Sequence, residues 1–189
     1  MHYLPSLKSK KNNHPDTKRS GRGFTLIEMI IATFIMVVGI VGVMSLLQRV
    51  IFSSSVSSSR LIAAYLAQEG AEIVRNVRDT NWLEARSSLN PWDEGLTGCS
   101  GTGFIADYSH SYSPNQIDPA FPCYSGQYLN VDASGFYSYS SGVQTKFKRK
   151  ILITQGSNSD IKNVLIEINW TDRGVSYFLS VQENLYNWR

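Results

Sequence analysis

The sequence predicts an α+β fold in which a long N-terminal helix, membrane-spanning in its first half, packs on a C-terminal antiparallel sheet. Three patterns lead to this expectation. A run from Phe24 to Leu47 is uncharged except at Glu28, and apolar residues at helical spacing follow it as far as Arg78. Three stretches after residue 142 alternate apolar and polar side chains. Such alternation is typical of antiparallel strands with one face in water.

Residues 1–23 form a polar leader without an apolar face. Its basic residues outnumber its one acid, Asp16; they are Lys8, Lys10, Lys11, Lys18, Arg19 and Arg22. A basic flank holds the N-terminal side of a membrane helix in the cytoplasm and sends the rest of the chain across. We therefore expect a single-pass protein of the cytoplasmic (inner) membrane, with its N-terminus in the cytoplasm and its C-terminal domain outside.

Residues 24–47 are predicted to form the transmembrane helix. At 1.5 Å per residue this run is roughly 36 Å long, enough to cross a hydrocarbon core of about 30 Å. A carboxylate at Glu28 costs about 2.5–3.5 kcal/mol in that setting, so it should have a partner. A signal peptide would carry a small-residue cleavage site after the apolar run, whereas here Gly23 precedes it. The alternative for Glu28 is an interfacial acid on an ordinary signal anchor.

The residues Arg22-Gly23-Phe24-Thr25-Leu26-Ile27-Glu28 resemble the cleavage and methylation motif of type IV prepilins and type II secretion pseudopilins. The resemblance implies that prepilin peptidase cuts after Gly23, removes residues 1–23 and N-methylates Phe24. It also implies assembly with other pilin or pseudopilin subunits into a pilus or pseudopilus. There the Glu28 carboxylate would pair with the amine of a neighbouring subunit. The resemblance fades beyond Arg78, and the helix lacks the proline common in major pilins, which favours a minor pilin or a pseudopilin.

Residues 48–78 are predicted to continue the helix in amphipathic form. The serine-rich run 53–59 could be a flexible linker, but an apolar stripe resumes directly after it. The stripe consists of Leu61, Ile62, Tyr65, Leu66, Ile73, Val74 and Val77. The charged and amide side chains Gln68, Glu69, Glu72, Arg75 and Arg78 are expected to face water or neighbouring subunits.

The predicted C-terminal region, residues 79–189, begins with a loop over residues 79–142. Trp82 and Trp92 are expected to anchor this loop to the helix, the alternative being an aromatic platform for a ligand. Cys99 and Cys123 lie on the predicted exported side, where disulfides persist, and we expect them to be bonded to each other. The chain-entropy estimate for such a bond is roughly 3–4 kcal/mol. Two cysteines are too few for a structural zinc site, and we expect neither a metal nor a cofactor.

Residues 143–187 are predicted to form the antiparallel sheet. The alternating apolar positions are Val143, Thr145, Phe147, Ile151 and Ile153, then Val164, Ile166, Ile168 and Trp170, and finally Val175, Tyr177, Leu179 and Val181. Residues 171–174 form the turn of a hairpin, and residues 156–160 link the first two strands. The basic residues Lys146, Lys148, Arg149 and Lys150 are expected to form a solvated strand face, with binding to an acidic partner or surface as the alternative.

The charge balance argues against nucleic acid as a main partner. The leader holds six of the 18 Lys and Arg and one of the 15 Asp and Glu, which leaves 12 basic against 14 acidic residues in the processed chain. That chain has one histidine, two expected disulfide cysteines and no phosphate loop or hydrolase motif. We therefore predict a structural subunit rather than an enzyme. The alternatives are a pilus-tip adhesin or binding module on the same scaffold and a signal-anchored enzyme.

Overall fold

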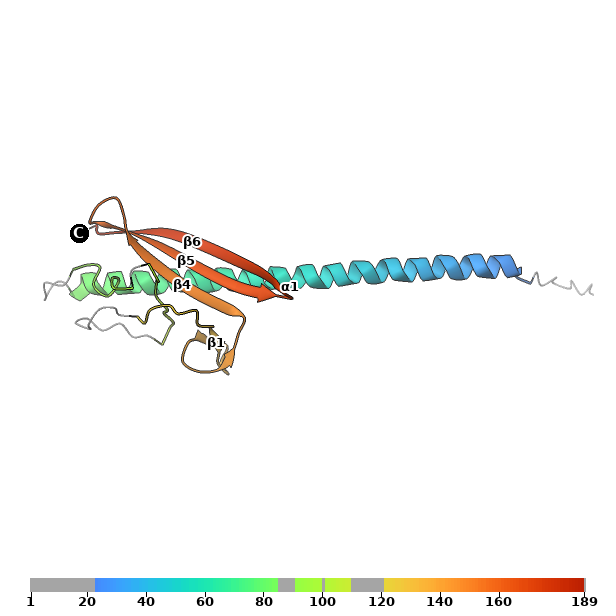
Figure 1. Ribbon diagram of the computed structural model, residues 1–189, viewed down its shortest axis with the longest axis horizontal. Coiled ribbons are helices and arrows are strands. Elements are labelled where there is room, and N and C mark those ends of the chain that lie inside the picture. Colours follow the sequence, from blue (N-terminus) through green and yellow to red (C-terminus); the bar gives the residue numbers. More distant parts are fainter. Residues whose placement is uncertain (1–22, 85–90, 100, 110–120, 189) are drawn as a thin grey trace, which may run out of the picture. The chain divides into compact units, whose positions relative to one another are not determined.

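A computed structural model describes residues 23–84, 91–99, 101–109 and 121–188 of the chain (Figure 1). The chain divides into two compact units, residues 1–49 and residues 50–189, called here the first and the second unit. Helix α1, Leu26–Glu84, contributes to both units. All described strands belong to the second unit.

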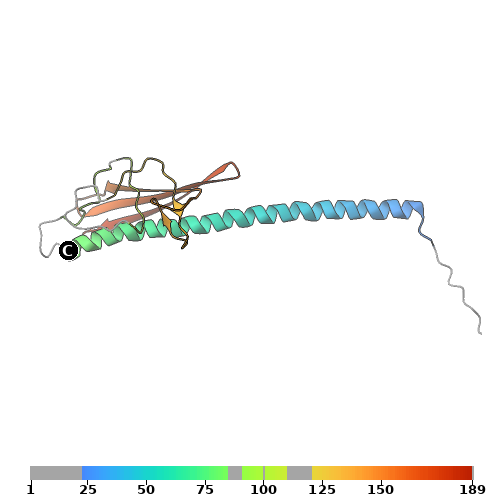
Figure 2. The same cartoon turned by 90° about the horizontal axis from the view of Figure 1, so that it is seen from below.

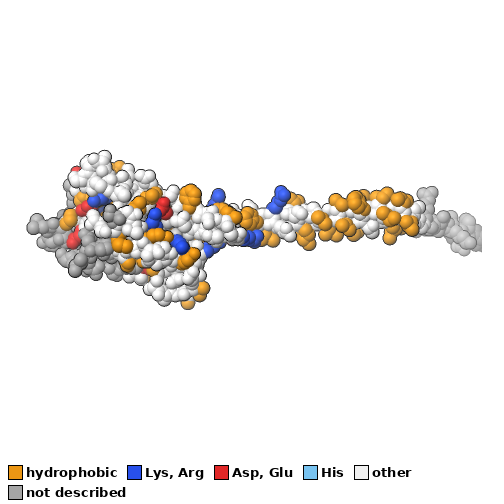
Figure 3. Space-filling view, in the orientation of Figure 1, with side chains coloured by type: hydrophobic (Ala, Val, Ile, Leu, Met, Phe, Trp, Pro, Cys, Tyr) orange, Lys and Arg blue, Asp and Glu red, His pale blue; other side chains and the backbone are white. Residues whose placement is uncertain are grey.

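In the first unit, α1 is apolar and solvent-exposed. Every residue from Gly23 to Arg49 is exposed, and hydrophobic side chains cover this part of the helix in Figure 3. By length and composition α1 qualifies as a membrane-spanning helix, with a mean hydropathy of 2.7 over its most apolar window. An exposed apolar surface fits a lipid environment, so the helix fits an inner-membrane-anchored protein.

The serine run 53–59 is helical throughout, which confirms that the helix continues past the apolar segment. Ser55 and Ser59, one turn apart, face the sheet. The Ser55 hydroxyl donates to Asp172 Oδ2 over 3.2 Å, and the Ser59 hydroxyl accepts from Lys146 Nζ over 2.8 Å. The serines therefore serve as small polar contacts of the helix with the strand ends, not as a linker.

The helix ends at Glu84, beyond the predicted end at Arg78. The prediction placed a loop after Arg78 because polar residues follow it. One of these residues, Asn81, is instead fixed by hydrogen bonds to residues later in the chain. The Asn81 side-chain amide is buried and donates to the carbonyl oxygens of Trp92 and Glu94 over 3.0 and 2.9 Å. These bonds satisfy the buried amide, and thereby extend the packed part of the helix by a further turn.

Arg78 does not face water, as the sequence suggested, but is only 7% exposed. Its guanidinium lies 4.7 Å from the ring centroid of Trp82 and 4.8 Å from that of Trp188, and it pairs with Asp79 over 2.9 Å. A guanidinium stacks well on aromatic faces and is weakly hydrated. The contact joins the end of the helix to the C-terminal end of the chain.

The main sheet has three antiparallel strands in the order β4-β5-β6. The strands are β4, Phe147–Gln155; β5, Ile161–Asp172; and β6, Val175–Tyr186. Figures 1 and 2 show them along the C-terminal half of α1 and on one side of it. Ile151, Ile166 and Val181 occupy paired positions across the three strands. A helix packed on an antiparallel sheet confirms the predicted α+β fold.

The turn between β5 and β6 matches its prediction. Only Arg173 and Gly174 connect the two strands, and their φ angles are 49° and 81°. Two successive positive φ angles define the type I′ turn, whose twist suits a two-residue hairpin. The other predicted link, residues 156–160, lies between the observed ends of β4 and β5.

A second, small sheet lies within and just after the region predicted as a loop. Its strands are β1, Asn130–Val131; β2, Tyr137–Ser138; and β3, Val143–Gln144, in the order β2-β1-β3. The stretch predicted as one strand from Val143 to Ile153 is therefore split. Thr145 causes the break, because its N–H and its hydroxyl both donate to the Leu129 carbonyl, over 2.9 and 2.7 Å. The alternating pattern alone could not reveal that Thr145 bonds Leu129 in this way.

The core lies between α1 and the main sheet, and includes Ala63, Leu66, Ala67, Val74, Val77, Ile151, Val164, Ile166, Ile168 and Trp170. Gly70 lies on the face of α1 that packs against the sheet. A Cβ atom there would lie 3.3 Å from both Arg149 Cδ and Ile166 Cγ2. That distance is tighter than ordinary van der Waals contact, so glycine suits this position.

The expected disulfide between Cys99 and Cys123 is present, with a Cα–Cα distance of 5.5 Å. Between the two cysteines, Phe104 forms bridges to Cys123 on one side and to Ile151 on the other. The Phe104 N–H donates to the Ile151 carbonyl over 2.7 Å, and the Ile151 N–H returns a bond over 3.1 Å. The disulfide therefore holds a segment that covers the outer edge of β4.

Replacing both cysteines with serine is expected to lower the free energy of unfolding by roughly 3–4 kcal/mol, because the unfolded chain regains loop entropy. Hydrogen exchange should rise more at residues 101–109 than in β5. Urea denaturation and exchange mass spectrometry of the two proteins would measure both effects. Equal loss of protection across the whole unit would contradict a local role for the bond.

Candidate functional site

The predicted processing residues lie at the start of α1. Gly23, Phe24 and Thr25 are not helical, and the helix begins at Leu26. The Thr25 hydroxyl oxygen accepts a bond from the Glu28 N–H over 3.3 Å, and the Thr25 carbonyl accepts from the Met29 N–H over 3.2 Å. Thr25 is thus the N-cap of the helix.

Thr25 is a functional residue that the sequence interpretation missed. Thr25-Leu26-Ile27-Glu28 has the Thr-x-x-Glu spacing of a capping box, in which the acid at the third helical position faces back to the cap. The spacing was readable in the sequence. It means that Glu28 lies in the first helical turn, where the helix dipole favours a carboxylate.

The bond between Gly23 and Phe24 is accessible. Phe24 is 77% exposed, and a Cβ atom on Gly23 would meet no other part of the protein within 4 Å. Extended, exposed chain beside a structured element is the preferred setting for proteolysis. A cut there would place a new amine one residue before the helix cap and close in sequence to the first helical turn, which contains Glu28.

The second candidate site is the basic run Lys146, Lys148, Arg149 and Lys150 at the start of β4. The prediction that this run faces solvent is wrong for Arg149. This side chain is 0% exposed. Its Nη1 donates to the Leu66 carbonyl and to Glu69 Oε2, both over 2.9 Å, and its Nη2 donates to the Ala106 carbonyl. Strand alternation is the reason, because Arg149 lies between Phe147 and Ile151 on the face that packs against α1.

Arg149 therefore joins the helix, the main sheet and the segment before residue 109. Its own carbonyl accepts a bond from the Tyr139 hydroxyl over 2.9 Å. Burial raises the pKa of Tyr139 to about 12, although the nearby Arg149 charge opposes that shift. Tyr139 consequently stays protonated and keeps donating over the whole physiological pH range.

Lys148 and Lys150 do lie on the opposite face of β4, whereas Lys146 precedes the strand and its Nζ donates to the Ser59 hydroxyl of α1 over 2.8 Å. Lys146 Nζ pairs with Asp172 Oδ2 over 3.0 Å, and this hydrogen bond holds the pKa of Asp172 below its usual range. Lys150 pairs with Glu167. Lys148 Nζ lies 4.2 Å from the ring centroid of Tyr128, a cation–π distance. The solvated-face prediction is confirmed for Lys148 and Lys150 but not for Arg149 or Lys146.

The tryptophans expected to anchor the loop are packed rather than presented to a ligand. Trp82 belongs to α1, not to the loop, and its ring centroid lies 4.6 Å from that of Trp188. Trp92 is half-buried against the core. Glu72 and Arg75 of α1 form an ion pair over 2.6 Å, and Arg75 also binds Glu183 over 2.6 Å.

Residues 18–44 match the family of the prokaryotic N-terminal methylation motif, which is the type IV prepilin and pseudopilin signature. The match includes the predicted cleavage site, Thr25 and Glu28, and ends inside the apolar part of α1. No curated protein and no solved structure showed significant similarity to the chain. The motif thus supports a type IV pilin-like or pseudopilin-like subunit that prepilin peptidase processes in the membrane.

Proposed function

We propose that this chain, which carries the processing signature of type IV prepilins and pseudopilins, is a minor structural subunit of a type IV pilus or a related secretion or DNA-uptake filament. The observation that carries the proposal is the cleavage motif directly before a capped, exposed and apolar helix. Its partners are prepilin peptidase, the inner membrane and other pilin or pseudopilin subunits.

Assembly is driven by packing of the apolar half of α1 against the same segment of neighbouring subunits. Gly39 and Gly42 support this, because an added Cβ on either would meet nothing within 4 Å. Small residues let helices approach closely where no water drives them together. The Glu28 carboxylate then finds its compensating charge in the amine that cleavage creates on a neighbour.

The second unit has a structural rather than a catalytic role. Its carboxylates support this view, because five of those in the part of the chain that the structure describes pair with a cation on another segment. Glu69 pairs with Arg149 over 2.9 Å, Asp93 with Lys162 over 2.9 Å and Glu183 with Arg75 over 2.6 Å. A carboxylate used in this way costs stability to release, which disfavours a proton-transfer role.

Processing at Gly23 tests the proposal. We expect protein from sheared filaments of the native host to begin at N-methylated Phe24, as measured by intact mass and N-terminal sequencing. Gly23→Leu should block cleavage and filament entry, because the peptidase must accept a small side chain before the cut. Gly23→Ala is the matched control and should be cleaved. Filaments that contain residues 1–23 would contradict the proposal.

A further inference from the structure

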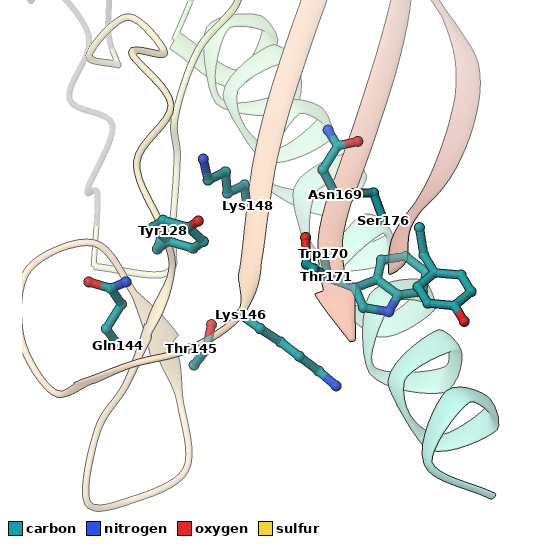
Figure 4. A pocket seen from close by; sticks show the side chains of 10 residues that line it. Tyr128, Gln144, Thr145, Lys146, Lys148, Asn169, Trp170, Thr171 and Ser176 are labelled. Carbon is teal, nitrogen blue, oxygen red and sulfur yellow. The ribbon is translucent and has the colours of Figure 1, made fainter. Parts of the chain in front are cut away.

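A pocket of about 540 Å³ opens between β4, β5 and the start of β6, a volume in the range of small-ligand sites. Figure 4 shows Tyr128 and Lys148 to one side of β4, and Asn169, Thr171 and Ser176 to the other. Asn169 and Thr171 flank Trp170, which is buried toward α1. Their side chains therefore lie on the sheet face that points away from the helix.

The lining is rich in groups that bind hydroxyls. It combines the amides of Gln144 and Asn169 with the hydroxyls of Thr171 and Ser176. Amides and hydroxyls both donate and accept hydrogen bonds, so together they match the alternating donors and acceptors of a sugar ring. The strands fix the backbone positions of Asn169, Thr171 and Ser176, so only side chains need to be ordered on binding.

The pocket carries an excess positive charge. None of the described residues that line it is Asp or Glu, whereas Lys146 and Lys148 both are part of the lining. Lys146 is compensated by Asp172 over 3.0 Å. Lys148 instead lies over the Tyr128 ring, with its Nζ 4.2 Å from the centroid. An aromatic face keeps an ammonium in place without neutralising it.

We propose that this pocket binds an acidic saccharide, with the carboxylate of a uronic-acid-type sugar on Lys148 and its ring hydroxyls on Asn169, Thr171 and Ser176. A charge-assisted bond to a carboxylate is stronger than a neutral one, so the lysine selects acidic over neutral sugars. A nucleic acid fits less well. Its backbone needs several uncompensated cations, whereas Lys146, one of the two lysines of the described lining, is already paired with Asp172.

The test uses the full-length protein in detergent and titrates it with trigalacturonic acid by calorimetry. Maltotriose serves as the neutral sugar and a short single-stranded DNA as the rival anion. We expect binding of the acidic trisaccharide alone, weakening as salt is raised. Binding of both sugars with equal affinity, tighter binding of the DNA, or no binding of the acidic sugar would each overturn the proposal.

Lys148→Gln should weaken binding of the acidic trisaccharide roughly tenfold or more, because the charge-assisted bond is lost. Lys150→Gln is the matched control, since Lys150 lies on the same face, is already paired with Glu167 and does not line the pocket. It should bind like the wild type. Thr171→Val, which keeps the shape and removes a hydroxyl, should weaken binding moderately. Unchanged binding in Lys148→Gln would overturn the assignment.

Discussion

Replacing Arg149 with methionine is expected to lower the free energy of unfolding of the second unit by about 2–4 kcal/mol. The substitution leaves the buried Ala106 carbonyl without its donor, at a cost of about 1–3 kcal/mol. It also removes two bonds from Nη1, to the Leu66 carbonyl and to Glu69. Glu69 is 31% exposed and can turn to water, so its lost partner adds less than a fully buried charge would.

Urea denaturation followed by tryptophan fluorescence would measure this effect in the full-length protein. All four tryptophans lie between residues 82 and 188, so the signal reports on the second unit alone. Arg149→Lys should fall between wild type and Arg149→Met, because one ammonium cannot reach all three acceptors.

Lys148→Met is the matched control for Arg149→Met, one position earlier on the opposite face of β4. It removes an exposed cation–π contact and should change stability by less than about 1 kcal/mol. If Arg149→Met were as stable as this control, the buried guanidinium would not hold the helix and the sheet together.

Replacing Glu28 with glutamine is expected to leave membrane insertion and cleavage largely intact but to reduce recovery of the subunit in sheared filaments. In a filament the neighbour's amine would remain unpaired, at a cost of about 3–5 kcal/mol. That cost corresponds to roughly a hundredfold or more in the incorporation equilibrium. Glutamine can still complete the capping box with Thr25, so the variant changes the charge and preserves the helix start.

Glu28→Leu should insert at least as well as the wild type, because it removes the polar group from the apolar run, and should also assemble poorly. Thr33→Val is the matched control in the same segment. The Thr33 hydroxyl bonds only within its own helix, to the carbonyls of Met29 and Ile30 over 2.9 and 3.0 Å, and this variant should assemble normally. The measured quantity is the ratio of subunit in filaments to subunit in membranes. Wild-type ratios for both Glu28 variants would mean that apolar packing alone recruits the subunit.

Local patterns were sufficient for a large part of this fold. The apolar run predicts the first half of α1 because one composition extends over many turns of helix. The stripe at Leu66, Val74 and Val77 predicts the second half, and period-two alternation predicts the strands of the main sheet. The processing motif was also readable, because a peptidase recognises contiguous residues from Arg22 to Glu28.

Local patterns did not predict the ends of elements that depend on hydrogen bonds to residues outside the element. The end of α1 depends on a bond from Asn81 to carbonyls beyond the helix. The break before β4 depends on two bonds from Thr145 to Leu129. Helix and strand propensities are too weak to predict such outcomes, because a single buried hydrogen bond outweighs them.

The sequence by itself determined that the chain has a prepilin-type start, a long helix and alternating strands, because each of these is a contiguous pattern. Only the tertiary structure decided that Arg149 is buried whereas Lys148 lines a pocket. Both are basic residues of one strand. Their environments differ because Arg149 meets acceptors at Leu66, Glu69 and Ala106, which are 83, 80 and 43 positions away. The burial of a charge depends on partners that only folding brings within hydrogen-bond distance.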